Sequence, residues 1–204
     1  MFKDVLSEGQ QRLLPLIHKF QNDFYLAGGT AIALQIGHRR SIDFDLFSRK
    51  SLNTLEIVNI IKRSALVINT TLEETTIELT LVVNGVKVTF LEYPFDIKPS
   101  LNLDNIIMMP DLLTLASTKA YSLGRRSKWK DYVDLYFIFR DHFTSKDVSQ
   151  KAKEIFGGGF NERLFREQLC YFEDVDFSEG IDFFKGRIND ETIKGFLEGV
   201  ATEL

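Results

Sequence analysis

The sequence is poor in cysteine and proline and has no long apolar run, and these shortages exclude several classes of protein. One cysteine, Cys170, stands among 204 residues, so an internal disulfide is excluded and no zinc site is predicted. Its apolar neighbours predict a buried, inert thiol. No apolar run reaches the ~20 residues that span a bilayer, and no signal-like stretch follows Met1. We therefore expect a cytoplasmic protein without a membrane partner.

The sequence also lacks an excess of positive charge. Its net charge of −4 argues against a general nucleic-acid binder, which needs clustered Lys and Arg. One local cluster, Arg125, Arg126, Lys128 and Lys130 around Trp129, leaves two interpretations open. It is either a surface for a nucleic-acid acceptor or a solvated loop with the tryptophan packed beneath it.

The order of the expected elements predicts an α+β fold with a helical C-terminal region. Strands are expected at 24–27, 42–47, 76–83 and 86–90, and helices at 7–20, 30–36, 53–64, 110–123, 130–140, 146–156, 162–172 and 190–203. We place a core domain at 1–105 and the helical region at 106–204. The pair Asn84-Gly85 predicts a two-residue hairpin turn.

That turn fixes a register and therefore two faces for the hairpin. Val83 then pairs with Val86, and Thr80 lies opposite Thr89. The face with Leu79, Leu81, Val83, Val86, Val88 and Phe90 is the core face. The other face carries Glu78, Thr80, Lys87 and Thr89.

Asp43 and Asp45 form the clearest candidate for a chemical site. Alternation along the strand 42–47 puts both carboxylates on one face, with Ile42, Phe44 and Leu46 on the other. Two carboxylates at this spacing repel each other unless a cation lies between them, and Mg²⁺ prefers such ligands together with phosphate oxygens. A solvated edge strand is the alternative for this pair on its own.

A glycine pair precedes the carboxylates. Gly28-Gly29 follows an expected strand and opens a short helix at Thr30, so backbone N–H groups can approach a phosphate. Taken alone, the pair also fits a simple tight turn. Together with Asp43 and Asp45 it predicts a phosphate cradle beside a metal site. Arg39, in the loop between them, offers a planar fork of donors to phosphates.

Three segments resemble one known family. They are 26–47 (LAGGTAIALQIGHRRSIDFDLF), 110–120 (PDLLTLASTKA) and 128–137 (KWKDYVDLYF). Their order and character resemble the AbiEii toxin family of DNA polymerase β-like nucleotidyltransferases. The resemblance covers roughly residues 22–140. It implies a polymerase β-like core, a mixed sheet with flanking helices.

The resemblance also implies a role for each matching residue. Asp43 and Asp45 would be catalytic metal ligands, and Lys119 and Asp131 would be catalytic as well. The residues expected to bind the nucleotide are Gly28, Gly29, Thr30, Arg39, Ser41, Lys119 and Asp134.

The sequence departs from the family pattern at Thr89. Related sequences often carry an aspartate there, a third carboxylate that activates the attacking hydroxyl. Thr89 is neutral and a weaker ligand. Glu78 lies diagonal to it, on the same predicted face, and is the best local substitute as a third metal ligand. A solvent-facing strand residue is the alternative for Glu78.

We therefore predict a nucleotidyltransferase that uses Mg²⁺ or Mn²⁺ and a nucleoside triphosphate. The acceptor would be an RNA such as tRNA, or a protein. The resemblance implies the toxin of a toxin–antitoxin or abortive-infection system, with a winged-helix antitoxin as partner. A catalytically weak scaffold that binds a nucleotide or a partner is the alternative, supported by Thr89. Metal-dependent phosphoester hydrolysis is a third interpretation, and the sequence has no His-rich set of metal ligands to support it.

Overall fold

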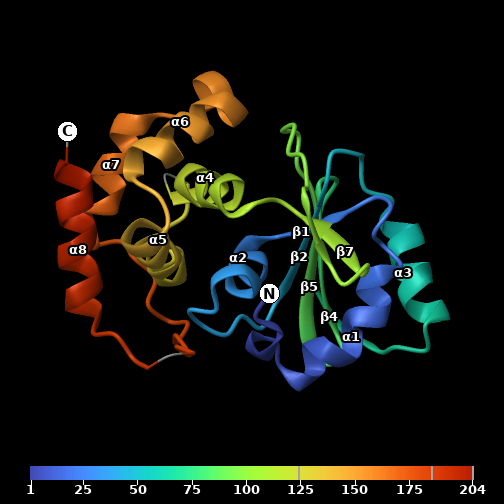
Figure 1. Cartoon of the computed structure of the whole chain (residues 1–204). Helices are drawn as coiled ribbons and strands as arrows, with labels where there is room; N and C mark the ends of the chain where they lie inside the picture. The colour runs from blue at the N-terminus through green and yellow to red at the C-terminus, as the bar shows by residue number, and fades with distance from the viewer. Residues whose placement is uncertain (124, 185, 204) are drawn as a thin grey trace. The chain divides into compact units, whose positions relative to one another are not determined.

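The structure is a computed structural model that describes residues 1–123, 125–184 and 186–203. The chain forms two compact units, Met1–Asp111 and a second that begins at Leu112. The first holds all the strands and the second holds helices α4 to α8 (Figure 1). The predicted α+β fold is confirmed.

The first unit is built on a five-stranded mixed sheet in the order β1-β2-β5-β4-β3. Its elements are η1 (Lys3–Val5), α1 (Glu8–His18), β1 (Tyr25–Ala27), α2 (Gly28–Ile36), β2 (Phe44–Ser48), α3 (Thr54–Arg63), β3 (Ile68–Glu74), β4 (Glu78–Val83), β5 (Val86–Glu92), β6 (Leu101–Leu103) and β7 (Ile107–Met109). The pairing of β2 with β5 is parallel, and the other three pairings in this sheet are antiparallel. Helices α1 and α3 lie on one side of it and α2 on the other (Figure 1).

The β4–β5 hairpin forms as the Asn-Gly turn predicts. Asn84 and Gly85 have φ angles of 46° and 81°, the positive values that a type I′ turn requires. Val83 pairs with Val86 and Thr80 with Thr89. The predicted core-face residues are all buried, and they are Leu79, Leu81, Val83, Val86, Val88 and Phe90. The register prediction is confirmed.

The predicted strand 42–47 begins two residues later than expected. Strand β2 begins at Phe44, and Ile42 before it exposes 66% of its surface. The carbonyl of Asp43 accepts hydrogen bonds from the side chains of Gln10 and Thr30 instead of joining the strand ladder. Because this backbone is held by side chains, the alternation of the strand does not extend to Ile42.

Side-chain caps and a glycine set the helix ends in the first unit. Ser7 and Gln10 form a capping box at the start of α1, and the Asn53 side chain accepts from the Glu56 N–H at the start of α3. Helix α2 ends at Gly37, which takes the left-handed conformation (φ 63°). These signals are local, which is why the sequence predicts them.

The edge strand β3 is the most exposed part of the sheet. Six of its seven residues are exposed, and its pairing with β4 shifts register between Ile68 and Thr70 and again between Thr71 and Glu73. At the opposite edge, the short strand β7 packs beside β1. The two edges are therefore built differently.

In the described part of the second unit there are five α-helices and one short 3-10 turn. They are α4 (Leu112–Leu123), α5 (Trp129–Asp141), α6 (Ser145–Phe156), η2 (Gly157–Gly159), α7 (Glu162–Leu169) and α8 (Asp190–Thr202). Helix α7 ends before Cys170, whose side chain is exposed, so the prediction of a buried thiol is wrong. Among the described residues, no helix is long and apolar enough to cross a membrane.

Candidate active site

The two adjacent glycines allow charged side chains to lie against the start of α2. Gly28 has a φ of +66°, and a Cβ placed on it would lie 1.9 Å from Oδ2 of Asp45. A Cβ on Gly29 would lie 2.5 Å from Nη2 of Arg39. Any larger residue would push these groups away. The residue before the helix is Ala27, which has no side-chain oxygen to cap the first N–H groups.

The two aspartates come to one face by different routes. Asp45 lies within β2, between Ala27 of β1 and Thr89 of β5. Asp43 lies just before the strand, and its Oδ2 is 2.7 Å from Nζ of Lys87. Since Lys87 and Thr89 alternate with the core residues of β5, both carboxylates are on the face away from the core.

Sequence reasoning placed Lys87 on this face but gave it no role at the site. A lysine in a strand is an ordinary surface residue, and its partner lies 44 positions earlier in the chain. Only the parallel pairing of β2 with β5 brings the two together. Without that pairing, no sequence signal identifies the contact.

Thr30 and Ser41 hold the loop that carries Asp43. The Thr30 hydroxyl is 2.9 Å from the Ser41 hydroxyl and also contacts the Asp43 carbonyl oxygen. Thr30 has no exposed surface and Ser41 exposes 8%. Thr30 therefore connects the start of α2 to the loop that carries Asp43.

Arg39 is almost fully buried beside the glycines. It exposes 4% of its surface, and its Nη1 donates a 3.0 Å hydrogen bond to the Arg40 carbonyl. Because a backbone carbonyl holds this guanidinium, its orientation is fixed, and its planar set of N–H donors points in a defined direction. The neighbouring loop residue His38 is also buried.

Glu78 lies on the predicted face, at the start of β4. Its carboxylate accepts a 2.8 Å hydrogen bond from the Thr80 hydroxyl, which is in turn 3.1 Å from the Thr89 hydroxyl. A row of three polar side chains thus runs from Thr89, beside Asp45, to Glu78. Among the described residues, no three His, Cys, Asp or Glu side chains gather as a metal site.

The second unit contains a buried charged group. Nζ of Lys119 on α4 pairs with Asp131 and lies 3.0 Å from Oδ2 of Asp134, both on α5. Lys119 exposes 4% and the two aspartates none. Arg126, half-exposed, adds a 3.1 Å contact to Asp131. Lys119 and Asp131 thus lie on two successive helices and form an ion pair.

The charges around Asp131 control its protonation. Burial alone would raise the pKa of its carboxyl, but the nearby charges of Lys119 and Arg126 and the hydrogen bond from Lys119 outweigh it. The pKa of Asp131 therefore lies below its ordinary value. The carboxylate stays ionised at neutral pH, so this is a charged group within the unit's core.

The basic segment around Trp129 is largely paired within the protein. Lys128 and Lys130 both contact the Glu179 carboxylate, the first at 2.7 Å. Trp129 exposes 3% and packs against Tyr132 and other aromatic rings. A buried tryptophan offers no stacking surface, so the structure favours the interpretation of a loop with the tryptophan beneath it.

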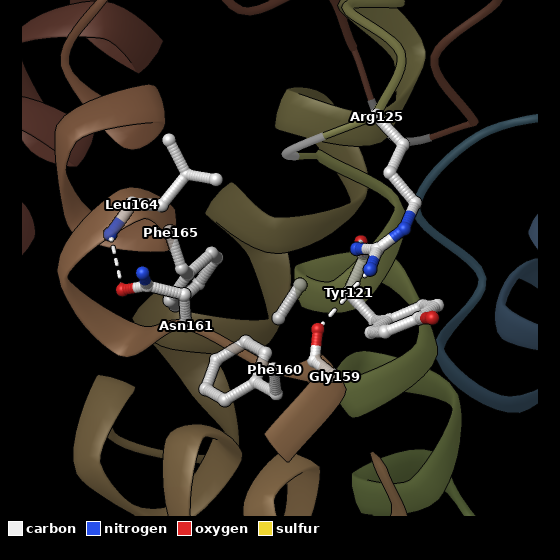
Figure 2. Close-up of a pocket in the computed structure, with 8 residues that line it drawn as sticks. Tyr121, Arg125, Gly159, Phe160, Asn161, Leu164 and Phe165 are labelled. Atoms are coloured by element: carbon white, nitrogen blue, oxygen red, sulfur yellow. Dashed lines mark hydrogen bonds between the residues drawn. The ribbon is translucent and has the colours of Figure 1, made fainter. Parts of the chain in front are cut away.

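A pocket in the second unit has an arginine at its rim (Figure 2). It has a volume of about 220 Å³ and is lined by Tyr121, Arg125, Phe160, Asn161, Leu164 and Phe165, among others. The Arg125 guanidinium lies 3.6 Å from the ring centroid of Tyr121 and donates to the carbonyls of Tyr121 and Gly159. Figure 2 shows the guanidinium beside the Tyr121 ring. Sequence reasoning did not predict this pocket.

Comparison with solved structures shows which proteins share this fold. MenT4, a nucleotidyltransferase toxin from Mycobacterium tuberculosis H37Rv, superimposes with a TM-score of 0.66 at 14% identity, covering 95% of this chain and 80% of that one. JHP933 from Helicobacter pylori gives a TM-score of 0.57 at 18% identity, covering 96% and 91%. This chain therefore shares its fold with MenT4, a nucleotidyltransferase toxin, and with JHP933.

Sequence comparison gives the family. The family model described as "Nucleotidyl transferase AbiEii toxin, Type IV TA system" matches residues 16–201, so the chain belongs to the AbiEii nucleotidyltransferase family. An uncharacterized protein of Aquifex aeolicus (strain VF5) is 30% identical, over 83% of this chain and 88% of the relative. The predicted family and enzyme class are confirmed.

Proposed function

We propose that this nucleotidyltransferase moves a nucleoside monophosphate from a nucleoside triphosphate to an acceptor, with Mg²⁺ or Mn²⁺ as its metal. One observation carries the proposal: the Asp45 carboxylate lies against Gly28, and the Asp43 carboxylate lies on the same sheet face. The uncapped start of α2 supplies backbone N–H groups at this place. Carboxylates for a cation and N–H groups for phosphates thus occur together.

The donor set fits a hard divalent cation. Mg²⁺ prefers one or two carboxylates and fills its remaining positions with water and substrate phosphates. We propose that Asp43 and Asp45 hold it and that Gly28, Gly29 and Arg39 hold the triphosphate. Ser41 and Thr30 position the loop. A bound cation would neutralise charge on the triphosphate and align the attacking and leaving oxygens.

The reaction follows from these roles. An acceptor hydroxyl attacks the α-phosphorus, a new P–O bond forms, and the bond to the β-phosphate oxygen breaks. Pyrophosphate leaves, and the hydroxyl proton passes to solvent. Positioning and charge stabilisation supply most of the catalysis in such transfers, which suits a site of fixed glycines and a buried arginine.

For the second unit we propose a role in catalysis and nucleotide binding for the charged group of Lys119, Asp131 and Asp134. Two carboxylates restrain one ammonium there, so the lysine's position is fixed by its partners. Buried charged groups with shifted pKa values are more frequent at functional sites than elsewhere. This role is proposed independently of the roles of Asp43 and Asp45, and a separate variant tests it.

The acceptor and partner are proposed from the family. We infer that the acceptor is an RNA such as tRNA, or a protein, and that the chain is the toxin of a toxin–antitoxin or abortive-infection system. A separate winged-helix antitoxin would restrain it. The cytoplasm is the compartment that holds both nucleoside triphosphates and these acceptors. Thr89, where a third carboxylate is expected, supports a catalytically weak scaffold as the alternative.

The test is transfer from labelled triphosphates. We expect the wild-type chain with Mg²⁺ to label an acceptor in total RNA or protein from one of the four α-labelled triphosphates. Asp45→Asn should abolish labelling while the melting temperature stays close to that of the wild type, because this carboxylate does not fill the core. Asp43→Asn should abolish it as well, with some loss of stability because Lys87 loses its partner. Full activity of either variant under metal control would overturn the proposal.

A further inference from the structure

A lysine lies on one of the two carboxylates of the candidate metal site. Nζ of Lys87 is 2.7 Å from Oδ2 of Asp43, with 35% of the lysine side chain and 15% of the aspartate side chain exposed. The pair is thus partly shielded from water. Ion pairs in such places interact more strongly than pairs on an open surface.

A second cationic side chain, Arg39, lies at the glycine turn that the Asp45 carboxylate also contacts. Arg39 approaches Gly29, and Gly28 next to it approaches Asp45. Two cationic side chains thus lie near the two carboxylates: Lys87 on Asp43, and Arg39 beside the glycine next to the one that Asp45 contacts. A divalent cation that enters this site meets little net negative charge, and it competes with Lys87 for the same oxygen of Asp43.

We propose that Lys87 is a built-in counter-ion of Asp43 that must be displaced before a divalent cation binds. The free cation then binds weakly, and the cation complexed with a triphosphate binds well, because the phosphates supply negative charge that Lys87 and Arg39 accept. Lys87 is thus a positioning residue, because it makes binding of the divalent cation depend on the triphosphate. The inference rests on the proposed metal site at Asp43 and Asp45.

The experiment measures metal binding without any transfer reaction. Free Mn²⁺ is titrated into the protein and followed by its electron paramagnetic resonance signal. The preformed complex of Mn²⁺ with tripolyphosphate is titrated by calorimetry. Lys87→Met keeps the aliphatic stem and removes the charge. Lys87→Arg keeps the charge. Lys50→Met is the matched control, because Lys50 also pairs with an aspartate of the first unit, Asp23, at 2.5 Å.

We expect Lys87→Met to bind free Mn²⁺ at least tenfold more tightly than the wild type. The ratio of its affinity for the tripolyphosphate complex to its affinity for the free ion should fall by a similar factor. Lys87→Arg and Lys50→Met should bind like the wild type. Melting curves in the absence of metal confirm that each variant is folded, and Lys87→Arg keeps the test valid if Lys87→Met does not fold, since a tight-binding Lys87→Arg would overturn the proposal.

Asp45→Asn separates failure of this inference from failure of the proposed function. If Mn²⁺ binding is lost in Asp45→Asn but is the same in Lys87→Met and the wild type, the metal site stands and the role of Lys87 is overturned. If Asp45→Asn binds Mn²⁺ and its tripolyphosphate complex as well as the wild type does, or if neither protein binds them, the proposed metal site is wrong. The inference about Lys87 then fails with it.

Discussion

Gly28 and Gly85 have similar backbones but different surroundings. Both have positive φ angles, +66° and +81°. A Cβ on Gly28 would overlap the Asp45 carboxylate, whereas a Cβ on Gly85 would meet no atom within 4 Å. The first glycine is needed for its conformation and for the space it leaves, and the second only for its conformation.

This difference gives a matched pair of variants. We expect Gly28→Ala and Gly85→Ala each to lose about 1–2 kcal/mol of unfolding free energy, the cost of a left-handed backbone at a residue with a Cβ. Gly28→Ala should also abolish transfer and Mn²⁺ binding, because Asp45 must move. Gly85→Ala should keep both. Denaturant melts and the labelling assay measure the two effects, and an active Gly28→Ala would contradict the assignment.

At the scale of single residues, the sequence predicts roles that depend on local pattern and not those that depend on long-range pairing. The Gly-Gly turn and the alternation around Asp45 are local, and the structure has them as expected. Lys87 contacts Asp43 only through strand pairing, so no local signal indicates it. Ile42 was assigned to the strand because alternation was extended two residues too far.

The same distinction holds for whole elements. The β4–β5 hairpin was predicted because Asn84-Gly85 fixes the turn and the apolar alternation fixes the register. Strands β6 and β7 were missed because three residues are too few to show a period, whereas the equally short β1 was predicted from the Gly28-Gly29 pair that follows it. Cys170 was misplaced because the expected helix 162–172 ends three residues earlier, at Leu169.

Helices α4 and α5 are joined by buried charges, and we expect the removal of one of these charges alone to destabilise the protein. Lys119→Met would leave Asp131 and Asp134 buried and ionised side by side without the lysine charge that contacts both. We expect this variant to lose about 3–5 kcal/mol of unfolding free energy. The combined variant Lys119→Met, Asp131→Asn, Asp134→Asn should recover much of it, because the three buried charges are removed together and Arg126 is half-exposed to water.

The combined variant also tests the proposed role of the group. If the charges serve nucleotide binding or transfer, the folded combined variant should lose triphosphate affinity or transfer rate while its melting temperature stays near that of the wild type. If the charges only join the two helices, its kinetics should match the wild type. Chemical denaturation and the labelling assay, run on the same preparation, distinguish these outcomes.

For the whole molecule, ion pairs of the second unit predict a loss of stability in acid. Burial would raise the pKa of Glu179, but hydrogen bonds and charges from Lys128 and Lys130 lower it to about 2. A carboxyl whose pKa is lower in the folded state contributes stability above its unfolded pKa, and this contribution is lost as pH falls through the folded value. Asp131 acts in the same direction.

We therefore expect unfolding free energy to decrease from about pH 4.5 toward pH 2. Glu179→Gln should be less stable than the wild type at pH 6, and the difference should shrink as pH falls, because the wild type then protonates the same group. Denaturant melts at pH 6, 4 and 3 measure this convergence. A difference that stays constant across these values would exclude Glu179 as a source of the acid sensitivity.

The two edges of the sheet have a consequence for how the protein behaves at high concentration. A free strand edge can pair with the edge of another molecule, and regular, flat edges do so most readily. Here β7 packs beside β1, and β3 departs from regular pairing at two places. Such irregularities twist a strand and interrupt its row of donors and acceptors. The exposed strand β3 is therefore a poor template for aggregation, although almost its whole length faces water.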